Sequence, residues 1–140
     1  MDIKKIMKNN EETETPKVNK VAVAYSGGLD SSLAIELLRR KYKAREIVPI
    51  TIDVGQGEEE IQESRKKAKV LKINPLFFDL REEFTEVWIA RAIRANSDYL
   101  GYPVSTAMTR QVVAKKVAEV ALQKGCDAIL EGSSGKGNDQ

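Results

Sequence analysis

The chain has 140 residues, of which 41% are hydrophobic and 31% are charged, and this is enough for one folded domain with a core. The formal net charge of +2 is too small to indicate a nucleic-acid partner, and the single cysteine excludes an internal disulfide and is typical of a reducing compartment. Histidine is absent, which excludes a His base or a His-bound metal within this chain. No apolar run could cross a bilayer and no signal-peptide segment is visible, so we expect a cytoplasmic protein without a membrane partner.

Residues 1–19 are polar, mixed in charge and contain Pro16, a composition typical of a flexible tail or of a short helix before a linker. The folded domain is therefore expected over residues 20–140. Its first segment, residues 20–25, is short, apolar and rich in valine, and predicts a buried strand. Apolar residues recur at helical spacing after Ser32, so residues 26–32 are expected to form a strand-to-helix turn.

That turn reads Ser-Gly-Gly-Leu-Asp-Ser-Ser and has the composition of a phosphate-binding loop. Gly27 and Gly28 let the backbone approach a ligand closely, while Ser31 and Ser32 lie beside the free amides of a helix N-terminus, which favour an anion. Neither the Walker loop nor the Rossmann fingerprint is present. Asp30 would repel a phosphate unless a cation lay between them, which favours Mg²⁺. A plain glycine turn capped by Ser and Asp is the alternative interpretation.

The rest of the chain alternates strand and helix patterns. Strands are predicted at 46–52, 76–80 and 128–131, helices at 58–72, 81–96 and 110–124, and a long loop at 97–109. Pro49 fits best at the beginning of its strand or at a bulge, and Gly125 is expected to end the last helix. The order predicts an α/β fold, a doubly wound parallel sheet with helices on both faces.

Glycine-rich turns follow the first, second and last predicted strands, after residue 25, at 53–57 and after residue 131. In an open α/β sheet, ligands bind at the carboxyl ends of the strands. The turns therefore predict a composite site for a nucleotide and something larger. Other patterns favour structural roles: the basic run at 65–72 is typical of a solvated helix face, and Trp88 and the phenylalanines are typical of a core. Cys126 is expected to pack rather than to act as a nucleophile.

The Ser-Gly-Gly-Leu-Asp-Ser string at 26–31 resembles the PP-loop of the ATP pyrophosphatases, enzymes that split ATP into AMP and pyrophosphate. In addition SGGLDSS, DVGQGEE, YPVSTAMTR and GSSGKGNDQ, in that order, are similar to segments of argininosuccinate synthase over about residues 21–140. The resemblance implies an adenine nucleotide alpha hydrolase-like fold and an ATP- and Mg²⁺-dependent ligase of arginine biosynthesis. Such a ligase places AMP on the ureido oxygen of citrulline, and the amine of aspartate then displaces it. Members of that family are longer and oligomeric, so this chain resembles their nucleotide-binding part.

The resemblance also implies roles for individual residues. Asp30 and Ser31 would be catalytic, with Asp30 meeting Mg²⁺ through the phosphates. The ATP-binding set would be Ala24, Tyr25, Ser26, Gly27, Gly28, Leu29, Asp30, Ser31, Ser32, Ile52 and Gly132. The citrulline-binding set would be Tyr102, Thr106 and Asn138, and the aspartate-binding set would be Thr106, Ser134, Asn138 and Asp139.

Three positions depart from the family pattern. Ala107 stands where a serine is usual, so a hydroxyl expected on the ureido substrate is missing; Gln111 replaces a proline and Ser134 a threonine. The alternatives are therefore a PP-loop enzyme acting on a related amino acid, one that thiolates tRNA, and an ATP-binding module without activity.

Overall fold

The computed structural model describes residues 17–132, except for the side chains of Tyr99, Tyr102, Pro103 and Thr106. The elements in chain order are β1 (Lys20–Ala24), α2 (Leu29–Arg40), β2 (Glu46–Asp53), α3 (Glu58–Val70), β3 (Leu76–Asp79), α4 (Arg81–Glu83), the π-helical segment η1 (Phe84–Ile89), α5 (Ala90–Arg94), β4 (Asp98–Tyr99), β5 (Tyr102–Pro103), α6 (Ser105–Lys124) and β6 (Ala128–Leu130). Most of the predicted tail lies outside the described residues. Within the described part, no helix is long and apolar enough to span a membrane.

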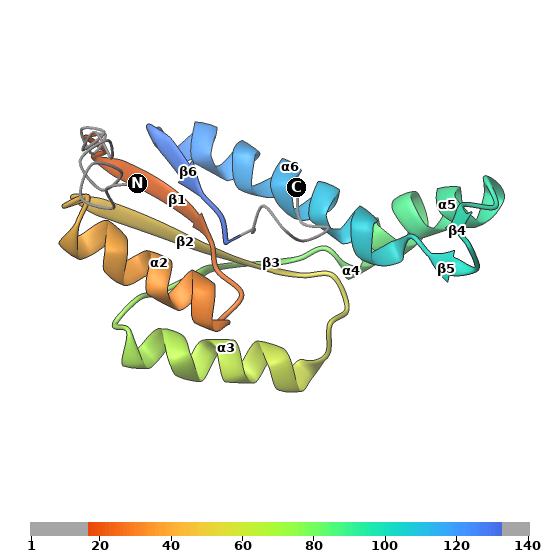
Figure 1. Cartoon of the computed structure of the whole chain (residues 1–140), viewed down its shortest axis with the longest axis horizontal. Helices are drawn as coiled ribbons and strands as arrows, with labels where there is room; N and C mark the ends of the chain where they lie inside the picture. The colour runs from red at the N-terminus through yellow and green to blue at the C-terminus, as the bar shows by residue number, and fades with distance from the viewer. Residues whose placement is uncertain (1–16, 133–140) are drawn as a thin grey trace, which may run out of the picture.

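Four parallel strands form the main sheet in the order β3-β2-β1-β6. β1 is central, because Val21 is aligned with Ile47 of β2 on one side and with Ala128 of β6 on the other. Helices α2 and α3 lie on one side of the sheet and α6 on the other (Figure 1). The predicted parallel sheet with helices on both faces is confirmed.

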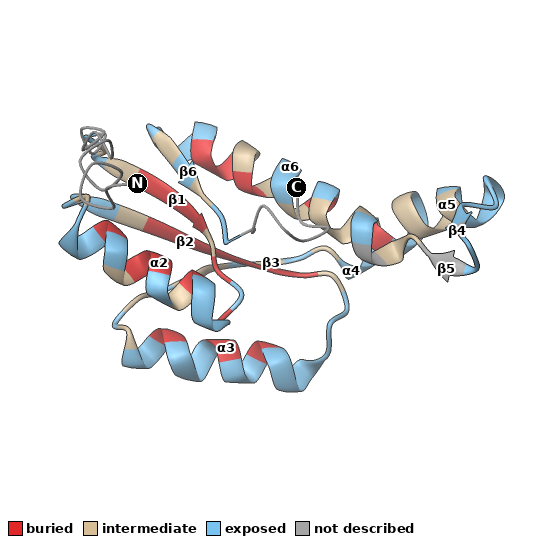
Figure 2. Ribbon diagram, viewed as in Figure 1, coloured by how far each residue is buried: buried red, intermediate tan, exposed pale blue. Residues whose placement is uncertain are grey.

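Figure 2 shows buried residues along β1 and β2 and on the helices that cover the sheet. Alternating side chains of the two strands build one core on each face of the sheet. Ala22, Ile50 and Ile52 pack with Val117 and Val120 of α6. Val21, Val23 and Tyr25 pack on the other face with Ile35 and Leu38 of α2 and Ala68 of α3. Fully burying each larger aliphatic side chain contributes about 1.5–3 kcal/mol, so the two layers hold the central strand firmly in place.

Pro49 lies in the middle of β2, not at its beginning or at a bulge as predicted, since the register runs unbroken from Lys20↔Glu46 to Ala24↔Ile50. The Tyr25 N–H donates to Ile50 O, so the polar groups of Ile50 face β1 and those of Pro49 face the opposite side. On that side, pairing with β3 begins only at Ile50↔Leu76. The missing N–H of Pro49 therefore costs no ladder hydrogen bond.

The prediction of a long loop at residues 97–109 is wrong. β4 and β5 form an antiparallel hairpin there, and Leu100 and Gly101 at its turn have φ of 53° and 79°. Two positive φ values are typical of a type I′ hairpin turn. α6 then begins at Ser105 rather than at Arg110 and ends, as predicted, where Gly125 adopts the left-handed conformation. Residues 105–109 lack apolar periodicity, which is why this helical turn could not be predicted.

Three further expectations need correction. Residues 29–32 of the predicted turn form the first turn of α2. Phe84 is buried, but Phe77 is 41% exposed, because β3 is an edge strand, and the Arg65 guanidinium covers its ring at 4.9 Å from the centroid. The helix predicted at 81–96 is interrupted by η1, which apolar spacing alone does not reveal.

Candidate functional site

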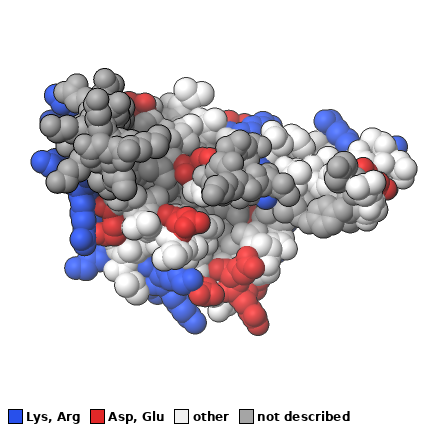
Figure 3. All heavy atoms as spheres, in the orientation of Figure 1, with Lys and Arg blue, Asp and Glu red and all other residues white. Residues whose placement is uncertain are grey.

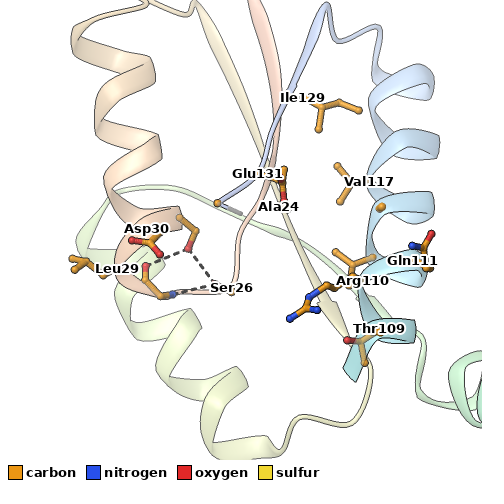
Figure 4. A pocket seen from close by; sticks show the side chains of 16 residues that line it. Ala24, Ser26, Leu29, Asp30, Thr109, Arg110, Gln111, Val117, Ile129 and Glu131 are labelled. Carbon is orange, nitrogen blue, oxygen red and sulfur yellow. Dashed lines mark hydrogen bonds between the residues drawn. The ribbon is translucent and has the colours of Figure 1, made fainter. Parts of the chain in front are cut away.

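A pocket of about 700 Å³ opens where β1 and β6 end, between the start of α2 and the first half of α6 (Figure 4). The residues that line it are Ala24, Ser26, Gly28, Leu29, Asp30, Ser31, Ala107, Thr109, Arg110, Gln111, Val113, Ala114, Val117, Ile129, Glu131 and Gly132. It lies at the carboxyl edge of the sheet, the edge that the glycine-rich turns predicted.

Hydrogen bonds inside the loop between β1 and α2 hold it in shape. The Gly28 N–H donates to Ser26 Oγ at 3.2 Å, and Ser31 Oγ donates to Gly28 O at 3.2 Å and lies 3.3 Å from Ser26 Oγ. The N-cap residue Gly28 has no side chain, and α2 has no side-chain cap. The first-turn amides of α2 therefore face the pocket without a capping group of their own, which suits an anionic ligand.

Gly27 anchors this loop to α3. Its φ is +80°, and a β-carbon built on it would lie 2.6 Å from Ser64 Cα. A contact of that length cannot be relieved by a side-chain rotation, so only glycine fits between the loop and α3. The loop thus packs against α3 at Gly27, while Ser26 and Gly28 on either side of it line the pocket.

The end of β6 closes on the same helix terminus. A β-carbon on Gly132 would lie 3.4 Å from Asp30 Cβ and 3.8 Å from Ser31 N. The absence of a side chain at Gly132 therefore leaves space next to the first turn of α2. The turns after β1 and β6 meet in space, as predicted.

The turn after β2 lies at the same sheet edge and is closed by its own side chains. The Asp53 carboxylate accepts from the Gly55 N–H at 2.8 Å, and its other oxygen is 3.7 Å from Arg81 Nε. Gln56 Nε2 donates to Ile52 O at 3.0 Å, and the Val54 N–H donates to Gln56 Oε1 at 2.9 Å. Asp53 therefore fixes the turn from the β3 side, and Gln56 fixes it through the main chain.

Arg81 also pairs with the last residue of β3. Its Nε donates to Asp79 Oδ1 at 2.9 Å, and this hydrogen bond is the main reason that the pKa of Asp79 is lowered to about 2. The same pairing raises the pKa of Arg81. Arg81 thus links the ends of β2 and β3 beside the turn.

α6 contributes polar residues to the pocket that were not predicted from the sequence as site residues. Thr109, Arg110 and Gln111 line the pocket, and the Arg110 side chain extends from α6 into the space in front of α2 (Figure 4). Glu131 lines the pocket from the end of β6. A basic residue directly after a predicted functional loop was the only hint in the sequence that Arg110 could bind a ligand. The sequence did not predict that the Arg110 side chain faces the pocket, because the helix was expected to begin only at that residue.

The predicted ATP-binding residues divide into two groups. The pocket is lined by Ala24, Ser26, Gly28, Leu29, Asp30, Ser31 and Gly132, but not by Tyr25, Gly27, Ser32 or Ile52. Tyr25 is 2% exposed and packs in the α2–α3 core, and Ile52 is 7% exposed in the α6 core. A ligand could reach these two residues through the main chain only.

The predicted amino-acid site falls mainly on residues that the structure does not describe. The backbones of Tyr102 and Thr106 lie in β5 and in the first turn of α6, but their side chains are not described. Ser134, Asn138 and Asp139 lie outside the described residues. Ala107, the departure from the family pattern, lines the pocket.

No group of three Asp, Glu or Cys side chains in the described part could hold a metal ion. Asp30 lines the pocket at the start of α2 as a single carboxylate. One carboxylate fits Mg²⁺ only if phosphate oxygens and water supply the other ligands, as is usual for Mg²⁺ bound with a nucleotide. The thiol of Cys126 packs against the α6 core, and burial raises its pKa, which makes it a poor nucleophile.

Comparison with known proteins decides the family. The profile described as "Arginosuccinate synthase N-terminal HUP domain" matches residues 20–140. The chain belongs to the argininosuccinate synthase family. The family resemblance of its four ordered motifs is thereby confirmed.

Similar members of this family come from archaea. The chain is 47% identical to argininosuccinate synthase of Methanopyrus kandleri over 123 residues, which cover 88% of this chain and 31% of that protein. It is 48% identical over 125 residues to the enzyme of Methanocaldococcus jannaschii, with the same coverage of each chain. The chain thus spans about a third of the length of these argininosuccinate synthases.

A solved structure shows the same fold without close sequence similarity. It is described as a predicted subunit of tRNA methyltransferase from Methanocaldococcus jannaschii, and it matches with a TM-score of 0.57 at 24% identity. The match covers 85% of this chain and 55% of the other. The α/β fold predicted from the sequence is therefore also that of this solved structure.

Proposed function

We propose that the chain binds Mg·ATP in the pocket and is the adenylating part of an argininosuccinate synthase. The observation that carries this proposal is the meeting of Gly132 with Asp30 and Ser31 at the uncapped start of α2. Two strand ends and a helix N-terminus converge there without an intervening side chain. Such a place suits a polyphosphate better than it suits a neutral ligand.

The phosphates would lie against the main-chain amides of the loop at 26–31. Arg110, on the opposite wall, would offset the negative charge that develops as pyrophosphate leaves. Mg²⁺, bound through the phosphates beside Asp30, would neutralise further charge on them. Ser31 uses its hydroxyl to hold Gly28 O, so its hydroxyl supports the shape of the loop.

The reaction needs positioning more than acid–base chemistry. The ureido oxygen of citrulline attacks the α-phosphorus, the bond to the β-phosphate oxygen breaks, and pyrophosphate leaves. The amine of aspartate then attacks the ureido carbon, AMP leaves with the oxygen, and the amine loses a proton. The contribution of the chain is to hold the α-phosphorus in line with the attacking oxygen.

Citrulline is the proposed first substrate, with a related amino acid as the alternative because of Ala107. Tyr102, Thr106 and Asn138 are proposed for citrulline, and Thr106, Ser134, Asn138 and Asp139 for aspartate. Asp139 would bind the aspartate ammonium, and Ser134 and Asn138 would bind its carboxylate. The methyl group of Ala107 cannot donate a hydrogen bond, so the ureido group would depend on other donors.

The test is a pair of measurements on the chain, Mg·ATP binding by calorimetry and citrulline-dependent exchange of labelled pyrophosphate into ATP. We expect the chain to bind ATP saturably and Asp30→Ala to abolish this binding. We expect citrulline-dependent exchange of pyrophosphate in any form of the protein that contains the complete amino-acid site. Binding without exchange would identify an ATP-binding module. Unchanged ATP binding or turnover in Asp30→Ala would show that the role given to Asp30 is wrong, and selective binding of labelled tRNA would favour a thiolation enzyme.

A further inference from the structure

A second pocket opens on the side of the sheet that α2 and α3 cover, between the second half of α3 and the edge strand β3 (Figure 1). We call it the α3 pocket, and its volume is about 270 Å³. Its polar and aromatic lining residues are Thr51, Ser64, Arg65, Lys69, Asn74 and Phe77. It is separate from the pocket proposed for Mg·ATP, because the two have no lining residue in common.

The most deeply buried part of the α3 pocket holds an unused hydroxyl group. Thr51 and Ser64 are only 6% and 4% exposed. Thr51 Oγ1 donates to Tyr25 O at 2.9 Å, whereas the described contacts give the Ser64 hydroxyl no hydrogen-bond partner. A buried hydroxyl is destabilising unless a ligand or water completes its hydrogen bonds. Ser64 is therefore available to a molecule in the pocket.

Two cations of α3 line the same pocket. Arg65 and Lys69 are four residues apart, so they are neighbours on the helix surface. Neither has a carboxylate partner among the described ion pairs, whereas Lys67 binds Glu63 Oε1 at 2.7 Å. The Arg65 guanidinium lies 4.9 Å from the centroid of the Phe77 ring, a contact that leaves its N–H groups free to donate. Among the described residues that line the pocket there is no Asp or Glu, so the charges favour an anion.

The rest of the lining and the size of the pocket limit the ligand further. Ala68, Ile73 and Pro75 add apolar surface beside the Phe77 ring. A volume of about 270 Å³ is below the range of about 300–1,000 Å³ that is usual for pockets of drug-sized ligands, so a nucleotide would not fit. A planar carboxylate matches the donor geometry of an arginine side chain. The lining therefore suits a small molecule with one carboxylate on an apolar body.

The buried side chains of the α3 pocket also touch the loop between β1 and α2. A β-carbon on Gly27 would lie 2.6 Å from Ser64 Cα and 2.8 Å from Ser64 Oγ, so α3 packs directly on that glycine. Thr51 holds Tyr25 O, at the residue before the loop. Ser26 and Gly28 line the other pocket. Residues 25–28 thus lie between the two pockets and contact the lining of both.

We propose that the α3 pocket binds a small carboxylate and that this ligand holds the loop between β1 and α2 in place. A carboxylate bound by Arg65, Lys69 and Ser64 fixes α3 against Gly27. A loop that is already fixed loses less conformational freedom when a second ligand binds to it. The carboxylate site itself does not depend on the proposed function, whereas its effect on Mg·ATP rests on that function. By linkage, each of the two ligands then tightens the binding of the other by the same factor.

The first experiment titrates the ¹⁵N-labelled chain with benzoate and follows the main-chain amide signals by NMR. Benzamide is the matched probe, because it has the same shape without the charge. We expect saturable shifts with benzoate at Ser64 and Lys69, and also at Gly27 and Gly28, and at least about tenfold weaker binding of benzamide. Equal binding of benzamide or of inorganic phosphate, or no saturable shift with benzoate, would overturn the carboxylate site. Shifts confined to α3 and β3 would overturn the contact between the site and the loop.

Variants identify the residues that bind the carboxylate. Lys69→Ala and Arg65→Gln should each weaken benzoate binding by about 5- to 30-fold, because each removes a charged donor. Ser64→Ala should weaken it by about 3- to 10-fold while the α3 backbone keeps its contact with the loop. Lys66→Ala is the matched control, since Lys66 is an exposed cation of the same helix outside the pocket lining, and it should bind benzoate normally. An equal loss in Lys66→Ala would indicate a general charge effect and overturn the site.

The effect on the nucleotide is measured by calorimetry. Saturating benzoate should tighten Mg·ATP binding by about 2- to 10-fold, benzamide should not, and Lys69→Ala should remove the effect. Unchanged or weaker ATP binding in the presence of benzoate would overturn the link between the two pockets. If the chain binds no ATP at all, the proposed function fails, but the NMR shifts at Ser64 and Gly27 still decide whether the carboxylate site exists and reaches the loop.

Discussion

A β-carbon on Gly132 would lie 3.4 Å from Cβ of Asp30, so the end of β6 touches the first turn of α2. The two residues are far apart in the chain and meet only because β6 pairs directly with β1. On the face of the molecule seen in Figure 3, acidic side chains gather where α3 begins, at Glu58, Glu59 and Glu60. These carboxylates complement the positive end of the α3 dipole, whereas the start of α2 has only Asp30.

Gly132→Val should reduce Mg·ATP binding with little loss of stability. The methyl groups would enter the space beside Ser31 N that we assign to a phosphate, while Gly132 is exposed and has no positive φ to lose. Calorimetry should show that ATP binds at least tenfold more weakly to this variant. Urea unfolding should show a change of less than about 0.5 kcal/mol in the free energy of unfolding. The Mg·ATP affinity of Gly132→Ala should lie between those of Gly132→Val and the parent chain. Normal ATP affinity in Gly132→Val would exclude a phosphate from this position.

Gly27→Ala should destabilise the fold by about 3 kcal/mol, because it combines a strained positive φ with a β-carbon pressed against the α3 backbone. Gly55→Ala is a matched control, since Gly55 also has positive φ but open space around it, and should cost only about 1 kcal/mol. Urea unfolding of both variants measures the difference. Equal losses would mean that contact with Ser64 does not hold the loop.

Arg110→Ala should weaken Mg·ATP binding by about 10- to 100-fold, because a charge-assisted hydrogen bond contributes about 1.5–3 kcal/mol. Arg110→Lys should keep part of the affinity, since it retains the charge but not the planar fork. Lys115→Ala, on α6 but outside the pocket lining, is the control and should bind ATP normally. Similar effects at both positions would indicate a general loss of positive charge.

Stability should fall in acid as Asp79 is protonated. Its pKa is about 2 in the folded chain, against 3.8 for an unperturbed aspartate, so the unfolded chain binds the proton more readily. The contribution of Asp79 is therefore complete above about pH 4 and is lost as the pH falls toward 2. NMR titration of the carboxyl carbon should give the low value in the parent chain and a value near 3.8 in Arg81→Ala. An unchanged titration in Arg81→Ala would show that Arg81 is not its partner.

Much of this arrangement could be read from the sequence. Valine-rich and alternating segments gave the four parallel strands within one residue of their ends, because burial between two helical layers imposes a local pattern. The Ser-Gly-Gly-Leu-Asp-Ser string predicted the loop between β1 and α2, because its glycines and hydroxyl groups act within the loop itself and do not depend on distant segments. The hairpin at 98–103 and the first turn of α6 were missed, because neither carries apolar periodicity.

By itself, therefore, the sequence predicted the four strands of the main sheet, most of the helices, the family, and the loop at 26–31 that we propose for phosphate binding. Only the tertiary structure decided which residues share the pocket. It brought Arg110 to face α2, buried the side chains of Tyr25 and Ile52, and set Gln56 against the end of β2. The physical reason is that periodicity reports the burial of each residue along its own segment, whereas contact between segments depends on strand order and on the direction of each main-chain group.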